Sequence, residues 1–164
     1  ETVAVLMQTM KDGGIQNNDI ALKSVLDFAS ARNPIKRIPA ELFVEELKNH
    51  DSKYSVLTSD YYTARISAPE IKSKTKDEEI RSYLVSVEAP LPLLKSCSVP
   101  DQCIASASTT SVGAAKPREG SYFVTFKWEL SKSKKNNCWL YDSCELMASS
   151  TAGLALPPSS VKTA

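Results

Sequence analysis

One β-hairpin near the C-terminal end of the chain, at residues 120–147, constrains the fold more than any other stretch. Its first half carries an apolar side chain at every second position, which is the period of a strand with one buried face. These side chains are Tyr122, Val124, Phe126, Trp128 and Leu130. A polar, lysine-rich break at 131–137 precedes a second apolar run that begins at Cys138. The pattern predicts a sheet around this hairpin, with helices packed on one of its faces.

Three helices are predicted in the first fifty residues. Apolar residues spaced by three and four positions indicate a helix over 2–12, which we expect the Gly-Gly pair at 13–14 to end. N-cap candidates precede a second helix over 19–31. Pro39 suits the first turn of a third helix over 40–49. The third helix is expected to bury Leu42, Phe43 and Leu47.

After these helices the apolar period changes to two, which indicates strands. Strands are predicted at 54–58, 62–66, 80–88 and 104–112. The charged segment 68–79 is expected to form a connecting loop or a helical turn. The segment 90–103 contains three prolines, so we expect a surface excursion there rather than a central strand. Helices followed by antiparallel strands predict an α+β fold.

The length and the net charge of the chain limit how many domains it can form and which partners it is expected to bind. The 164 residues suit one domain, which we place at 1–148, followed by a polar, proline-rich tail at 149–164 that is expected to be disordered or docked on a partner. The formal net charge of +1 gives no sign of a nucleic-acid partner, and no apolar run is long enough to span a membrane. The chain starts at Glu1, which suggests a mature chain without its leader, or a trimmed one.

Four cysteines leave the disulfide pattern open: Cys97, Cys103, Cys138 and Cys144. Cys97 and Cys103 flank a turn-like loop and are the candidate disulfide, with a redox-regulated module as a minor hypothesis. Cys138 and Cys144 are too far apart in an extended strand to bond. The alternative is four free, partly buried thiols. The cysteine spacing is poor for zinc, and we expect neither a metal nor a cofactor.

Several segments resemble the NTF2-like superfamily. Residues 25–30, 39–47 and the strand at Tyr54 look like the N-terminal half of such a domain, and 123–128 and 138–144 are similar to its last two strands. The chain most resembles an uncharacterised branch found in bacteria and plastid-bearing eukaryotes. The resemblance implies three N-terminal helices on a curved antiparallel sheet that encloses a cone-shaped pocket.

The candidate pocket residues come from this cone. They are Phe43, Tyr62, Phe126, Trp128 and Asp142. The alternative is that the aromatic side chains form the core and that Asp142 is an edge charge that discourages sheet pairing. The only histidine, His50, stands beside Asp51 at a predicted helix end. Neighbouring residues on a helix point in different directions, so this pair makes a poor acid–base dyad, and no catalytic residue is predicted.

The expected function is protein binding without catalysis. The tail residues Leu154, Leu156, Pro157 and Pro158, with the 90–103 loop, are the candidate partner contacts, and Lys132, Lys134 and Lys135 form a basic hairpin tip. The resemblance implies an accessory or assembly subunit of a chloroplast photosynthetic complex, with peripheral membrane association only through a partner. A secreted or periplasmic location is the alternative, and a homodimer is allowed. A small-molecule binder or lyase/isomerase-type enzyme that uses the cone is the second hypothesis.

Overall fold

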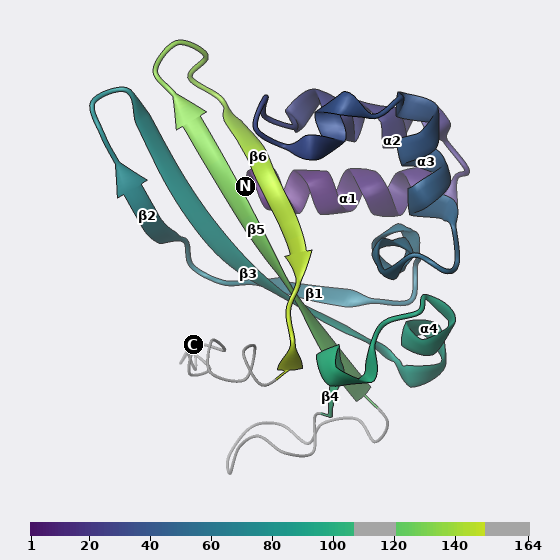
Figure 1. Ribbon diagram of the computed structural model, residues 1–164. Coiled ribbons are helices and arrows are strands. Elements are labelled where there is room, and N and C mark those ends of the chain that lie inside the picture. The colour runs from purple at the N-terminus through teal and green to yellow at the C-terminus, as the bar shows by residue number, and fades with distance from the viewer. Residues whose placement is uncertain (107–120, 150–164) are drawn as a thin grey trace, which may run out of the picture.

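The computed structural model describes residues 1–106 and 121–149 as an antiparallel sheet with helices on one face (Figure 1). The helices are α1 (Thr2–Ile15), α2 (Asp19–Ser24), α3 (Ala40–Lys48) and α4 (Leu91–Ser96), with the 3-10 helices η1 (Val25–Phe28), η2 (Pro34–Arg37), η3 (Lys53–Thr58) and η4 (Asp101–Cys103). The strands are β1 (Thr63–Ile66), β2 (Glu70–Lys74), β3 (Glu78–Pro90), β4 (Ala105–Ser106), β5 (Ser121–Ser133) and β6 (Trp139–Leu146). The predicted α+β class is confirmed.

Two long strands form the centre of the six-stranded sheet. β3 and β5 pair along their whole lengths, from Glu78 opposite Ser133 to Pro90 opposite Ser121. β1 and β2 follow one another along the free side of β3, and β4 and β6 follow one another along the free side of β5. A bridge between Ala29 and Tyr141 covers part of the outer edge of β6. The hairpin predicted at 120–147 is present and consists of β5 and β6, which pair in antiparallel fashion.

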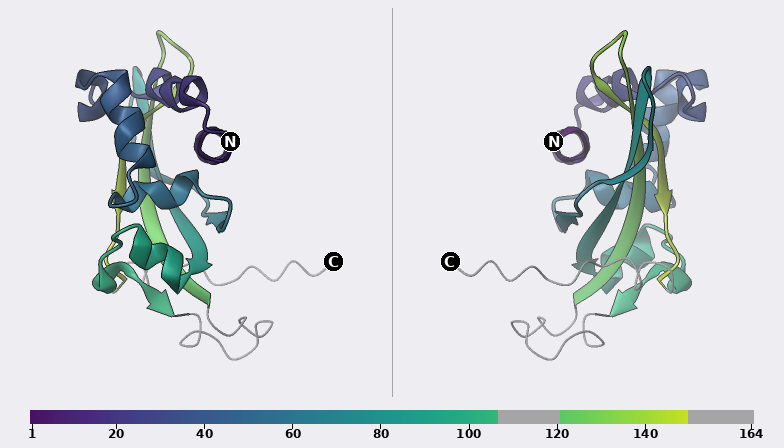
Figure 2. Two further views of the ribbon diagram at one scale, coloured as in Figure 1. Left: turned by 90° about the vertical axis from the view of Figure 1, so that its right-hand side faces the viewer. Right: turned by 90° about the vertical axis from the view of Figure 1, so that its left-hand side faces the viewer.

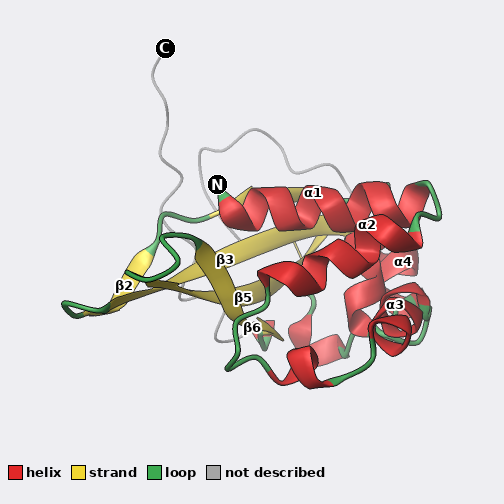
Figure 3. Ribbon diagram, turned by 90° about the horizontal axis from the view of Figure 1, so that it is seen from above, coloured by secondary structure: helices red, strands yellow, loops and turns green. Residues whose placement is uncertain are grey.

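The helical layer covers only the inner face of the sheet. Figure 2 shows the helices in front of the sheet in one view and behind it in the other, and Figure 3 shows α1, α2 and α3 together on that side. The inner face of β5 is buried under them from Val124 onward, as its period of two predicted, while Tyr122 is partly buried. Its buried side chains are Val124, Phe126, Trp128 and Leu130. α1 contributes Val3, Leu6, Met7 and Met10 to the same core, which accords with its predicted apolar stripe.

The prediction that Gly13 and Gly14 end the first helix is wrong, because α1 continues through them to Ile15. Both glycines serve close packing instead. A Cβ atom on Gly14 would lie 2.1 Å from the carbonyl oxygen of Thr58, and one on Gly13 would lie 2.7 Å from a methyl carbon of Leu22. α1 can therefore approach η3 and α2 only because these positions have no side chain.

Two further segments adopt 3-10 helices where the sequence predicted other structure. The second predicted helix keeps its α-form only to Ser24 and continues as η1. The predicted strand at 54–58 is wrong, because these residues belong to η3. The hydroxyls of Ser55 and Thr58 donate to carbonyl oxygens three residues earlier, at 2.8 Å each, which favours tight turns over an extended chain.

Charge and proline content misled the prediction in two places. The expected loop or turn at 68–79 contains β2, whose residues are exposed throughout, as a charged edge strand can be. The expected surface excursion at 90–103 is wrong, because α4 and the residues after it pack into the core. Pro92 is accommodated in the first turn of α4. The buried side chains are Leu94, Cys97, Val99 and Cys103.

Candidate functional site

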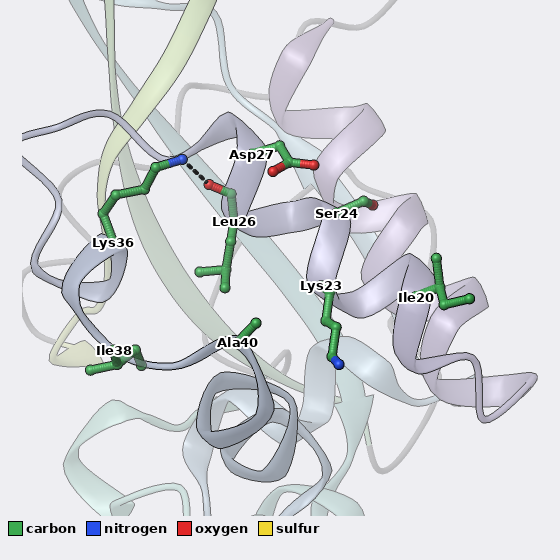
Figure 4. Close-up of a pocket in the computed structure, with 8 residues that line it drawn as sticks. All are labelled: Ile20, Lys23, Ser24, Leu26, Asp27, Lys36, Ile38 and Ala40. Atoms are coloured by element: carbon green, nitrogen blue, oxygen red, sulfur yellow. Dashed lines mark hydrogen bonds between the residues drawn. The ribbon is translucent and has the colours of Figure 1, made fainter.

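A groove with a defined lining lies on the outer side of the helical layer. It has a volume of about 460 Å³ and lies between α2 with η1 on one side and η2 with the start of α3 on the other (Figure 4). Its lining is Ile20, Lys23, Ser24, Leu26, Asp27, Lys36, Ile38 and Ala40. Figure 4 shows Leu26 pointing from η1 towards Ile38 and Ala40, so that the middle of the groove is apolar.

Polar contacts across the groove hold its two walls together. The Lys23 ammonium lies 2.9 Å from a carboxylate oxygen of Glu41, and this hydrogen bond lowers the pKa of Glu41. The Lys36 ammonium donates to the backbone carbonyl of Leu26 at 2.8 Å. Lys48 at the end of α3 pairs with Asp19 at the start of α2. These contacts link the two walls of the groove in the described structure.

The rim of the groove exposes apolar side chains. Ile20 is 81% exposed and Ile38 is 41% exposed. Leu42, which does not line the groove and which the sequence predicted to be buried, is 53% exposed on α3, and Val44 takes the buried place instead. Large apolar side chains that gather on one surface are typical of protein contacts. In the described part of the lining, Asp27 is the one carboxylate, and it makes no hydrogen bond or ion pair.

The candidate pocket aromatics lie in the core instead. Phe126 is completely buried and Trp128 is 2% exposed, and Phe43 and Tyr62 belong to the same buried cluster. Burial raises the pKa of Tyr62 to about 12. All four aromatic side chains belong to the buried cluster between the sheet and the helices, where they pack against other apolar residues.

Asp142, the fifth candidate pocket residue, does not join these aromatics. Glu129 is opposite Ser143 and Leu130 is opposite Tyr141, so Asp142 is the extra residue of a β-bulge. Its carboxylate accepts a hydrogen bond from the Ser131 hydroxyl at 2.9 Å. Side chains alternate along β5, so Ser131 lies on the face opposite Leu130 and Trp128. Asp142 is therefore on the outer face of the sheet.

Two buried polar atoms in the core have no hydrogen-bond partner in the described structure, the indole nitrogen Nε1 of Trp128 and the hydroxyl of Tyr141. The two rings are edge-to-face, with centroids 5.5 Å apart. Burial raises the pKa of Tyr141. An unsatisfied buried donor costs about 1–3 kcal/mol, so these two groups are expected to lower the stability of the fold unless something satisfies them.

The remaining candidates do not assemble into a reactive centre. His50 and Asp51 are both exposed beyond α3, where the backbone N–H of Asp51 donates to the side chain of Asn49 at 3.0 Å. All four cysteines are free thiols, so the candidate disulfide between Cys97 and Cys103 is not formed. Burial raises the pKa of Cys103 and of Cys144, which makes both poor nucleophiles. Across residues 1–106 and 121–149, no group of three or more acidic, histidine or cysteine side chains could hold a metal ion.

The tail contacts predicted from the sequence, Leu154, Leu156, Pro157 and Pro158, lie outside the described residues. In the part of the chain that is described, no helix has both the length and the apolar character needed to cross a membrane.

The groove itself was missed by the sequence analysis. The sequence feature that could have revealed it is Ile20. Leu22 and Val25 define the buried face of this helical segment, and Ile20 lies on another face, where a polar residue is expected. Comparisons with known proteins name no relative: no family model matches the chain, and neither a curated protein nor a solved structure matches it.

Proposed function

We propose that this chain is a non-catalytic protein-binding module with an NTF2-like cone whose interior is filled. The observation that carries the proposal is the groove, whose apolar rim is exposed while its lysines are already engaged by Glu41 and by the carbonyl of Leu26. A partner would insert apolar side chains between Ile20 and Ile38. The tail residues Leu154, Leu156, Pro157 and Pro158 would add contacts outside this groove.

The partner class in this proposal is a larger assembly. The resemblance of the sequence to an NTF2-like branch that includes plastid-bearing eukaryotes supports an accessory or assembly subunit of a chloroplast photosynthetic complex. The exposed apolar side chains of Ile20 and Ile38 support binding to a protein. Mild native purification of the full chain, followed by sizing and mass spectrometry, tests this. Co-migration with a large assembly is expected, and deletion of residues 149–164 should weaken it. A free monomer or dimer in every fraction would contradict the proposal.

One observation favours the alternative of a small-molecule binder or a lyase/isomerase-type enzyme. In the described structure, Trp128 Nε1 and the Tyr141 hydroxyl are buried without hydrogen-bond partners, so both are available to hydrogen-bond a polar ligand. The alternative predicts that the Tyr141 hydroxyl stabilises the native protein by a hydrogen bond to this ligand. A dry, filled interior predicts that the hydroxyl contributes nothing or destabilises.

A further inference from the structure

Two hairpin tips that are far apart in the sequence lie side by side at one end of the sheet. The turn between β2 and β3 meets the turn after β5, where the backbone N–H of Lys134 donates to the carbonyl of Asp77 at 3.1 Å. Figure 1 shows both tips projecting together at one end of the sheet. We call residues 74–77 and 132–135 the joined tips.

The joined tips concentrate positive charge that the whole chain does not have. Five lysines there have no carboxylate within ion-pair distance in the described structure: Lys74, Lys76, Lys132, Lys134 and Lys135. The neighbouring acidic residues are engaged, because Glu78 pairs with Arg32 and Glu79 pairs with Arg81 at 2.6 Å. Only Asp77 is an unpaired acid within the joined tips. The net charge of the tips is therefore strongly positive, in a chain whose total is +1.

One of the five lysines, Lys132, contacts an aromatic neighbour of the tips, Trp139. The Arg81 guanidinium lies 4.6 Å from the centre of the Trp139 ring, and the Lys132 ammonium lies 5.9 Å from it. These cation–π contacts keep Lys132 close to the other lysines against their mutual repulsion. Because two cations already lie over the half-buried ring, Trp139 is not a free platform on which a nucleotide base could stack.

We propose that the joined tips bind an acidic segment of a protein partner, a second contact that rests on the protein-binding function proposed above. Charge complementarity selects this occupant over the others. The large exposed apolar side chain nearest in sequence to the tips is Ile71 in β2, and the tips themselves carry none that could enter a lipid bilayer. A second copy of this chain would bring like charges together, which lysines on an edge strand oppose.

The test uses the full chain and a fluorescent, end-blocked peptide of twelve alternating glutamates and threonines, followed by anisotropy. Wild type should bind this peptide. Raising the salt from 50 to 300 mM should weaken binding several-fold, because the Debye length falls from above about 10 Å to below about 8 Å and screens the attraction between the exposed lysines and the glutamates. The double variant Lys76→Glu/Lys134→Glu should bind at least about tenfold more weakly. The matched control Arg37→Glu/Arg65→Glu changes the net charge equally at two exposed cations outside the tips, and should bind like wild type.

Three outcomes would overturn the inference. They are no peptide binding, equal loss in both double variants, and tighter binding of phosphatidylserine vesicles or a single-stranded DNA oligonucleotide at the same tips. Lysines that serve only to protect the edge strand would give the first outcome. Peptide binding should persist in the variant Ile20→Glu/Ile38→Glu. A failure of the proposal for the joined tips is therefore distinguishable from a failure of the proposal that the groove binds a partner.

Discussion

The interior behind β5 and the groove outside the helices both contain large apolar side chains, but only those of the groove are exposed to water. Phe126 and Trp128 are closed off by the helices, whereas Ile20 is 81% exposed on the rim of the groove. Burial of an aromatic side chain stabilises the fold, while an exposed isoleucine contributes little to it. The difference teaches that the interior holds the protein together, whereas the groove leaves apolar side chains exposed, which is why we propose it as the binding surface.

The largest effect should come from emptying the interior. Phe126→Ala removes a completely buried ring and should lower the free energy of unfolding by roughly 4 kcal/mol, since the cavity adds to the lost transfer energy. Ile38→Ala, on the rim of the groove, should cost less than about 1 kcal/mol. Denaturant unfolding of both variants measures the contrast. Equal losses would break the distinction between the two regions.

A smaller effect distinguishes an interior that is packed by side chains alone from one that holds a bound small molecule. Tyr141→Phe removes a buried hydroxyl without a partner, so we expect the free energy of unfolding to stay unchanged or to rise by up to about 1 kcal/mol. Tyr62→Phe is the matched control, because the hydroxyl of this buried tyrosine donates to the Leu57 carbonyl at 3.4 Å. Its loss should cost about 1 kcal/mol. A clear destabilisation by Tyr141→Phe would favour the small-molecule alternative.

The sequence predicted those parts of the fold in which one side-chain period decides the structure. The alternation along β5 located the central strand and its buried face, because a strand buried on one side has a period of two whatever surrounds it. The stripe of α1 was equally clear. The end of α1 was not, because Gly14 has its role through Thr58, a contact that no local pattern records.

The candidate site was harder to predict because its walls come from separate segments. Lys23 meets Glu41 and Lys36 meets Leu26 only after the chain has folded. Leu42 was predicted to be buried because it is apolar and helical, but α3 buries Phe43, Val44 and Leu47 and leaves Leu42 in solvent. For Asp142 the sequence left a pocket residue and an edge charge both open, because the strand alternation does not predict the direction of the extra residue of a β-bulge.

The most direct measurement is the size of the native particle that contains the full chain, compared between wild type and the double variant Ile20→Glu/Ile38→Glu. Tyr61→Glu, at another highly exposed apolar position, is the control. The groove account predicts that wild type and control migrate in a large assembly, while the double variant stays folded and migrates alone. If the double variant remained in the same assembly as wild type, the groove would not be the binding surface and the account would be contradicted.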